Sequence, residues 1–255
     1  MKRKTVCAGN WKLNKTPDEA ESYFKEFLPQ LEKSHESHLV FFPQTYSLDR
    51  VSQLLKNTSI GFGPQNVYFE GSGAFTGENS SSLAKSLGST HVLLGHSERR
   101  QYFAETDEDL NKKIDQVLAD ELSPMLCIGE TQEERQSGAT NEVLRSQLMG
   151  ALLGVSAEQA TRSLVIAYEP VWAIGTGEVA TPEMAQETHQ FVREVLKQLF
   201  GTETSTQMSI LYGGSVKPDN ASHLIEKPDI DGFLVGGASL KPQDFLSILR
   251  TVVRN

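Results

Sequence analysis

The feature of this chain that most restricts its fold is a series of short apolar runs, each ending in polar residues or glycine. The runs are rich in Val, Ile, Leu and Phe and are nearly continuous rather than alternating. That pattern is typical of parallel strands that are covered by helices. Eight runs are predicted as strands: Thr5–Asn10, His38–Phe42, Ser59–Gln65, His91–Gly95, Pro124–Gly129, Leu164–Glu169, Ser209–Gly213 and Gly232–Gly236.

Stretches with helical spacing lie between these runs, for example Phe24, Phe27, Leu28 and Leu31. Two helices have a threonine cap followed by proline and an acidic residue, after Thr16 and after Thr181. Eight strand–helix units in 255 residues, with no linker-like segment, predict one α/β domain over residues 1–255, a (β/α)8 barrel. An open doubly wound sheet is the alternative, but no G-x-G-x-x-G motif follows the first strand.

Composition excludes several classes of protein. The net charge of -9 argues against binding to a nucleic acid backbone. Cys7 and Cys127 lie far apart, so we expect reduced thiols in a cytoplasmic protein, with Cys127 buried in a strand. No apolar run is long enough for a membrane span, and the N-terminus lacks a signal-peptide core. The six histidines form no metal-ligand spacing, so no metal site is predicted.

One connection is unusually long. Asn66–Asn79 has neither helical nor strand periodicity and carries Tyr68, Phe69 and Phe75. Loops of this length are usually functional, and protruding aromatic side chains favour docking onto a partner chain. The alternative is a loop that folds back onto its own barrel.

In a barrel, functional residues follow the C-terminal ends of the strands. Lys12, His96 and Glu169 occupy such positions. Each has an ordinary structural explanation on its own: a surface lysine, a capping histidine or an ion-paired carboxylate. Together they provide a cation, an imidazole and a carboxylate, a set suited to proton abstraction beside a carbonyl group.

Glu169 is followed by Pro170, which keeps the strand end extended. The apolar segment Val171–Gly177 comes next and is predicted to be a lid that excludes water, with Trp172 exposed. A packed connector is the alternative. Glycine pairs also end the last two strands, at Gly213-Gly214 and Gly236-Gly237, and predict a phosphate site rather than simple tight turns.

Seven segments of this chain resemble the triosephosphate isomerase family, and the resemblance runs from the first strand to the last helix. They are Gly9–Lys12, Gly73–Glu78, Gly95–Arg100, Cys127–Thr131, Tyr168–Gly177, Tyr212–Val216 and Val235–Leu240.

The resemblance implies an enzyme of glycolysis and gluconeogenesis that interconverts dihydroxyacetone phosphate and D-glyceraldehyde 3-phosphate through an enediol(ate), without a cofactor. It implies that Glu169 is the base, that neutral His96 is the electrophile and that Lys12 offsets the negative charge, roles that general accounts of this enzyme also give. Asn10 would bind the substrate oxygens and Glu98 would order Lys12. The residues implied to bind the phosphate are Gly175, Ser215, Gly236 and Gly237.

The same resemblance implies a homodimer in which the Asn66–Asn79 loop enters the neighbouring subunit, with Phe75 and Thr76 at the interface. Three places depart from the family's usual sequence: Glu178 after the lid, Phe41–Gln44 at the end of the second strand, and the polar run Ser80–Ser82.

Two other functions fit parts of the sequence. A phosphate-binding aldolase would need a Schiff-base lysine at a strand end, commonly where this chain has Glu169. A catalytically inactive scaffold would be expected to have lost Lys12, His96 or Glu169, and all of them are present.

Overall fold

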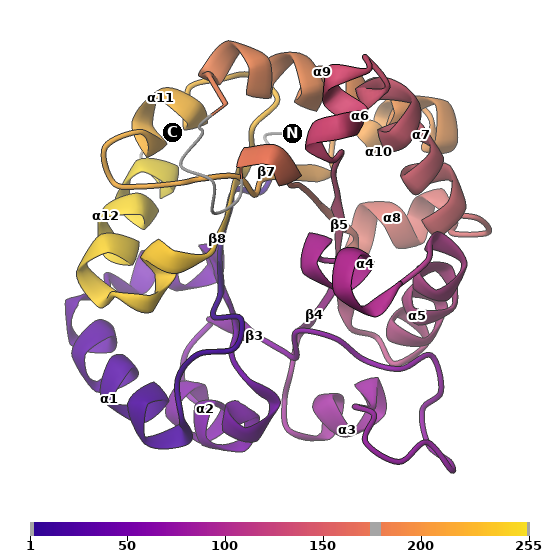
Figure 1. Ribbon diagram of the computed structural model, residues 1–255. Coiled ribbons are helices and arrows are strands. Elements are labelled where there is room, and N and C mark those ends of the chain that lie inside the picture. The colour runs from indigo at the N-terminus through magenta and orange to yellow at the C-terminus, as the bar shows by residue number, and fades with distance from the viewer. Residues whose placement is uncertain (1–2, 174–179, 254–255) are drawn as a thin grey trace.

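The computed structural model describes residues 3–173 and 180–253, and within them the strands form one parallel sheet of eight (Figure 1). The strand order is β3-β2-β1-β8-β7-β6-β5-β4. Strands that are consecutive in sequence lie side by side, and the first strand, β1, also pairs with the last, β8. The strands are β1 Val6–Asn10, β2 Leu39–Phe42, β3 Gly61–Phe62, β4 His91–Leu94, β5 Ser123–Ile128, β6 Val165–Tyr168, β7 Ser209–Tyr212 and β8 Gly232–Val235.

The sheet curves until its two ends meet. Between β3 and β4, the N–H of Thr90 donates to the carbonyl of Phe62 at 2.9 Å and that of Leu93 to Pro64 at 3.1 Å. This closure confirms the predicted (β/α)8 barrel and makes the open doubly wound sheet wrong. β3 is shorter than the predicted Ser59–Gln65, and Pro64, which has no N–H to donate, lies just beyond its end.

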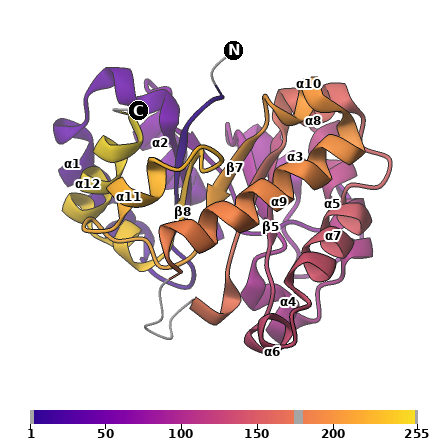
Figure 2. The same ribbon diagram turned by 90° about the horizontal axis from the view of Figure 1, so that it is seen from above.

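Helices form a ring outside the strands (Figures 1 and 2). Thr16 and Thr181 cap α1 and α9 as predicted, with Pro17 and Pro182 at the first helical positions. The predicted helical spacing beyond Phe27 is wrong, because α1 ends there and Pro29 falls in a short 3-10 turn. The α-helices are α1 Pro17–Phe27, α2 Leu48–Leu55, α3 Ser81–Ser86, α4 Ser97–Phe103, α5 Asp107–Ala119, α6 Gln132–Gln136, α7 Thr140–Ala151, α8 Ala157–Ser163, α9 Pro182–Phe200, α10 Thr202–Ser205, α11 Ala221–Ile225 and α12 Pro242–Val253.

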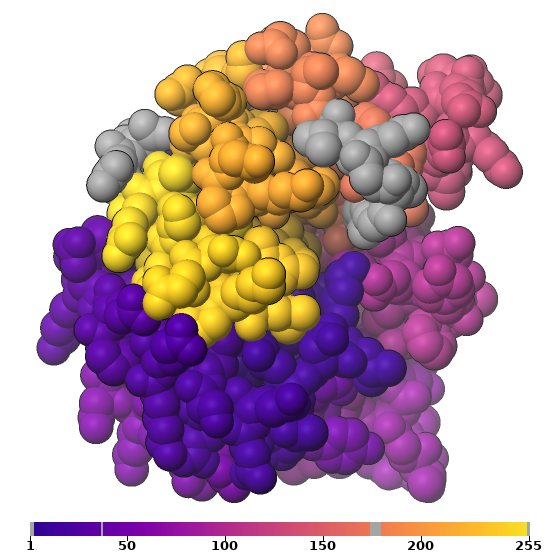
Figure 3. Space-filling model, turned by 60° about the vertical axis from the view of Figure 1, so that its left-hand side comes forward, coloured from indigo at the N-terminus to yellow at the C-terminus, as the bar shows by residue number. Residues whose placement is uncertain are grey.

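The ring also closes between the ends of the chain. Figure 3 shows C-terminal residues, in yellow, packed against N-terminal residues, in indigo. α12 lies against α1, and the rings of Phe27 and Phe245 have centroids 6.0 Å apart.

The polar start of α3 is explained by Asp120, which accepts hydrogen bonds from the hydroxyls of Ser81 and Ser82.

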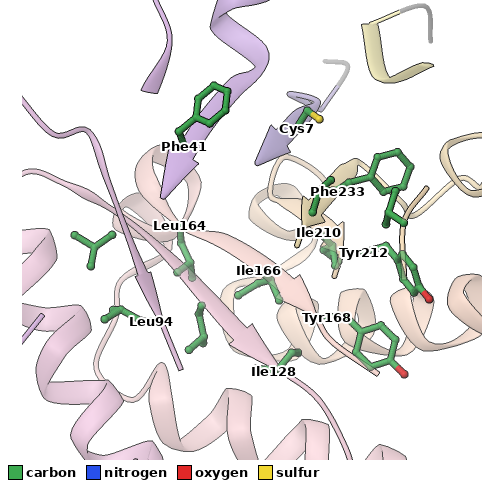
Figure 4. Packing of buried hydrophobic residues seen from close by; sticks show 14 of the residues in the cluster. Cys7, Phe41, Leu94, Ile128, Leu164, Ile166, Tyr168, Ile210, Tyr212 and Phe233 are labelled. Atoms are coloured by element: carbon green, nitrogen blue, oxygen red, sulfur yellow. The ribbon is translucent and has the colours of Figure 1, made fainter. Parts of the chain in front are cut away.

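Apolar side chains form two layers because successive strand residues point to opposite faces of the sheet. Cys7, Phe41 and Ile128 belong to the large cluster between strands and helices (Figure 4). Val6, Ala8 and Cys127 belong to a smaller cluster of alternate strand residues. Both cysteines are buried and unbridged, which confirms the burial predicted for Cys127, and burial raises the pKa of its thiol well above the ordinary value. Polar residues lie outside these two apolar layers, where the strands end.

Candidate active site

A cavity of about 320 Å³ lies where the strands end, on the side of the barrel predicted to carry function. It brings together residues that are widely separated in sequence and that follow β1, β4, β6, β7 and β8. The predicted site residues that line it are Asn10, Lys12, His96, Glu169, Ser215, Gly236 and Gly237. Gly175, the rest of the segment 174–179 and therefore Glu178 fall outside the described residues. The cavity thus brings a carboxylate, an imidazole and an ammonium group together beside the glycine turns.

Lys12 has a left-handed backbone, with φ of 49°. For a residue with a side chain this conformation is strained, so it needs support from its surroundings. The side-chain amides of Gln44 and Gln65 both donate to the Lys12 carbonyl, and Asn10 Oδ1 accepts from its N–H at 3.0 Å. These bonds hold the lysine at the rim of the cavity.

The sequence interpretation missed Gln44 and Gln65 as parts of the site. Gln44 follows the predicted strand His38–Phe42, and Gln65 is the last residue of the predicted strand Ser59–Gln65, so their place at a strand end was an available signal. The departure at Phe41–Gln44 therefore bears on more than local packing, because Gln44 contacts the backbone of a site residue.

The Lys12 ammonium contacts the carboxylate of Glu98, with Nζ 2.6 Å from Oε1. Glu98 lies in the first turn of α4, and its own N–H donates to His96 Nδ1 at 3.3 Å. Glu98 therefore connects the cation to the imidazole. The ordering role that the resemblance implies for Glu98 would act through this contact.

His96 caps α4 and is 5% exposed. Its Nδ1 accepts a backbone N–H, so that nitrogen carries no proton and a neutral ring has its proton on Nε2. Nε2 lies 2.9 Å from Glu169 Oε1. An N–H at Nε2 is therefore aimed at the carboxylate and into the cavity.

Glu169 directly follows β6 and is 2% exposed. Its second oxygen, Oε2, accepts the N–H of Ser97 at 2.9 Å. A Cβ at Gly213 would lie 2.9 Å from Glu169 Cγ, so the first glycine after β7 leaves space for this side chain. The carboxylate is thus held between the start of α4 and the end of β7.

The pKa values of His96 and Glu169 are coupled. Burial raises the pKa of Glu169, but the charge and hydrogen bond of His96, the Ser97 N–H and Lys12 outweigh it and lower the pKa below its ordinary value. Burial lowers the pKa of His96, but the charge and hydrogen bond of Glu169 raise it above the ordinary value. Once the contact with Glu169 is lost, burial and Lys12 favour a neutral imidazole, and the charge of Glu98 opposes them with a smaller effect.

The glycine turns lie beside Lys12. A Cβ at Gly236 would lie 3.6 Å from Lys12 Cε, whereas one at Gly237 would meet no atom within 4 Å. The carbonyl of Ser215 accepts from Asn220, which fixes the turn after β7. Exposed backbone N–H groups next to a cation form a suitable site for a phosphate group.

The beginning of the predicted lid is packed rather than exposed. Trp172 is 8% exposed and its indole donates to Glu130 Oε1 at 2.9 Å, so the predicted exposure of this residue is wrong. The Arg135 guanidinium covers the indole ring, 4.5 Å from its centroid. The sequence did not indicate this anchor because its parts come from different connections.

The Asn66–Asn79 loop projects beside α3 (Figure 1). Hydrogen bonds tie its base, since the Tyr68 N–H donates to the Asn79 carbonyl at 2.8 Å. Tyr68 stacks on Phe69 with ring centroids 4.0 Å apart, and Phe75 lies 4.6 Å from Tyr68. Phe75 is nevertheless 38% exposed and Thr76 is also exposed. The aromatic residues pack on one another, and the tip of the loop stands in solvent.

Among residues 3–173 and 180–253, no group of three or more His, Cys, Asp or Glu side chains is arranged to hold a metal ion. None of the helices in the same residues combines the length and the apolar character needed to cross a membrane.

Residues 5–252 match the family described as triosephosphate isomerase. The chain is 50% identical over 248 residues to the triosephosphate isomerase of Carboxydothermus hydrogenoformans, covering 97% of this chain and 98% of the relative. It is 52% identical over 245 residues to that of Bdellovibrio bacteriovorus, with 96% and 98% covered. The chain belongs to the triosephosphate isomerase family. As a member of that family it is an isomerase.

Proposed function

We propose that the chain interconverts dihydroxyacetone phosphate and D-glyceraldehyde 3-phosphate through an enediol(ate), with Glu169 as the base and His96 as the electrophile. Family membership supports the overall reaction. The observation that carries the residue assignment is the 2.9 Å contact between His96 Nε2 and Glu169 Oε1 inside the cavity. A base and an N–H donor at this separation can reach adjacent atoms of a small substrate.

In the proposed reaction, Glu169 removes the proton on the carbon next to the carbonyl group and returns it to the neighbouring carbon. The Nε2–H of His96 donates to the carbonyl oxygen, where negative charge develops, and then shuttles protons between the two oxygens. Binding of the substrate displaces the contact between His96 and Glu169. This frees the carboxylate to act as a base and leaves the imidazole neutral, for the electrostatic reasons given above.

Lys12 provides positive charge for the substrate and for the enediolate, and Asn10 hydrogen-bonds the substrate oxygens. Glu98 keeps Lys12 in place through their 2.6 Å contact. The phosphate is held by Ser215, by the backbone at Gly236 and Gly237, and by Gly175 from the segment that the structure does not describe. The chemistry we propose uses side chains and backbone groups alone.

The test is the interconversion of the two triose phosphates, followed by NMR, for the wild type and for Glu169→Gln. We expect turnover to fall by about a thousandfold because the base is lost. The inhibition constant of inorganic phosphate should stay unchanged, since its proposed ligands are untouched. Glu158→Gln, on the outer helix α8, is the matched control and should keep full turnover. Undiminished turnover in Glu169→Gln would refute the base assignment, and a six-carbon product would indicate an aldolase.

We also propose a homodimer in which the Asn66–Asn79 loop, with Phe75 and Thr76, enters a second copy of the chain, in the cytoplasm. The exposed loop tip supports the assembly, and the two unbridged thiols support a reducing compartment. Sedimentation over a range of dilutions tests the assembly. An active monomer at low concentration would contradict it.

A further inference from the structure

Gln147 lies on α7, in the outer ring of helices, and yet it bonds to the end of a barrel strand. Leu144, Leu148 and Ala151 bury the inner face of α7 completely, and Gln147 lies on the same side at helical spacing. Its side-chain amide makes a pair of hydrogen bonds with Gly129, the residue after β5. The Gly129 N–H donates to Oε1 at 2.9 Å, and Nε2 donates to the Gly129 carbonyl at 3.0 Å.

The two hydrogen bonds between Gln147 and Gly129 lie just beyond the end of the pairing between β4 and β5. The pairing of β4 with β5 ends at Leu94 and Leu126, before Gly129 is reached. A backbone N–H and carbonyl left without strand partners require other bonds if they are shielded from water. The amide of Gln147 satisfies both groups of Gly129 at once, as a neighbouring strand would.

On its other side, Gly129 touches the backbone of Glu169. A Cβ added to Gly129 would lie 1.8 Å from the Glu169 carbonyl oxygen, so the two backbones are in closer contact than any side chain would allow. The Glu169 N–H donates to the Ile128 carbonyl at 2.8 Å and the Val171 N–H to the Glu130 carbonyl at 3.2 Å. The peptide of Gly129 therefore sits between the hydrogen bonds that fix the backbone on both sides of the proposed base.

We propose that Gln147 is a positioning residue for Glu169: its amide clamps the Gly129 peptide, against which the backbone of the base is packed. The inference rests on the proposed function, in which Glu169 moves the proton. Loss of the clamp lets the end of β5 shift, and the carboxylate shifts with it. Small displacements of a reacting group cost rate far more than they cost binding.

The main test compares Gln147→Met, which keeps the shape and removes both hydrogen bonds, with Gln186→Met. Gln186 is the matched control because it too accepts a backbone N–H and donates to the same residue, Asp229, whose position before β8 is at the opposite end of the barrel. We expect kcat to fall by about tenfold in Gln147→Met. The inhibition constant of inorganic phosphate should not change, and Gln186→Met should keep the wild-type kcat. Equal kcat values in the two variants would overturn the proposal.

Gln147→Glu gives a readout that loss of structure alone does not produce. Its carboxylate can accept from the Gly129 N–H but repels the Gly129 carbonyl, whereas the protonated carboxyl restores the donor. The ratio of its kcat to the wild-type kcat should therefore rise as the pH falls from about 8 to about 5, because burial and the facing carbonyl raise the pKa of a carboxyl. A flat ratio overturns the proposal. If Gln147→Met does not fold, this titration alone decides.

A double variant separates this inference from the function on which it rests. If Gln147 acts through Glu169, adding Gln147→Met to Glu169→Gln should cause no further loss of kcat. A further tenfold loss in the double variant would overturn the positioning role and leave the base assignment intact. Wild-type turnover in Glu169→Gln alone would instead refute the base assignment.

Discussion

The two ends of the barrel both carry a buried histidine among charged groups, and they use these groups differently. In the upper region, at the C-terminal ends of the strands, the carboxylate of Glu169 contacts His96 beside an open cavity. In the lower region, at the N-terminal ends of the strands, Arg193 donates to the carboxylates of Asp229 and Asp231 and also to backbone carbonyls. Each nitrogen of its guanidinium is bonded within the protein.

The difference lies in whether the buried histidine lines a cavity that is open to small molecules. His189, in the lower region, is completely buried, and its Nδ1 lies 3.1 Å from the Asp229 carbonyl. Burial lowers its pKa to about 4, so it stays neutral. His96 is nearly as buried, but it lines the cavity together with its carboxylate partner. A substitution in the upper region should therefore cost reaction rate, and one in the lower region should cost stability.

The largest effect is expected in the upper region, for Lys12→Met. We expect kcat/KM to fall by about a thousandfold, or about 4 kcal/mol, because the cation that faces a nearly dianionic substrate is lost. The thermal unfolding temperature should hardly change, because the partly exposed carboxylate of Glu98 can be solvated once Lys12 is gone. Steady-state kinetics and calorimetry test both parts. A large loss of stability with a small loss of rate would reverse the comparison.

Arg193→Met tests the lower region. It leaves two carboxylates, Asp229 and Asp231, without their main cation, and we expect a loss of about 3 kcal/mol in the free energy of unfolding. The kcat of the folded fraction should equal that of the wild type. Denaturant unfolding with parallel kinetics measures the two quantities. A fall in kcat without a fall in stability would show that the two ends are not independent.

His189→Gln sharpens the comparison through pH. The unfolded chain protonates this histidine near its ordinary pKa of 6.5, whereas the folded protein does so at about 4. The stability that the neutral residue contributes is therefore complete above pH 6.5 and is lost as the pH falls towards 4, by about 3 kcal/mol. Unfolding measured across this range should be less dependent on pH in the variant. Identical slopes for the two proteins would contradict the assignment.

The smallest effect is expected for Gln65→Met. It removes an amide that donates to the carbonyls of Lys12 and Phe42, both at 2.9 Å. The left-handed backbone of Lys12 then loses part of its support. We expect kcat/KM to fall about fivefold, or about 1 kcal/mol. A loss as large as that of Lys12→Met would mean that Gln65 fixes the lysine almost alone.

Much of this organisation could be predicted from the sequence. Strands buried on both faces have an apolar signature, so the barrel and the strand ends that carry Lys12, His96 and Glu169 followed from local patterns. The strained backbone of Lys12 and the anchoring of Trp172 could not be predicted. Both depend on contacts between residues far apart in the chain, and a single sequence does not record such distances. The exposure predicted for Trp172 was wrong for this reason, since Glu130 and Arg135 meet it only in the folded barrel.

The closure between β3 and β4 has a consequence for cooperativity. β3 comprises only Gly61–Phe62, and the hydrogen bonds from Thr90 to Phe62 and from Leu93 to Pro64, just beyond the strand, join this segment to the opposite end of the sheet. The Asn66–Asn79 loop starts just beyond β3, and the chain then returns through α3 to β4. The loop and the helix together therefore span the junction between β3 and β4, which is the seam of the barrel. A second chain seated on the loop would hold the seam shut as well as cover a surface. Amide hydrogen exchange at Thr90 and Leu93 would then slow with rising protein concentration, because closing the ring and pairing the subunits would be one linked equilibrium.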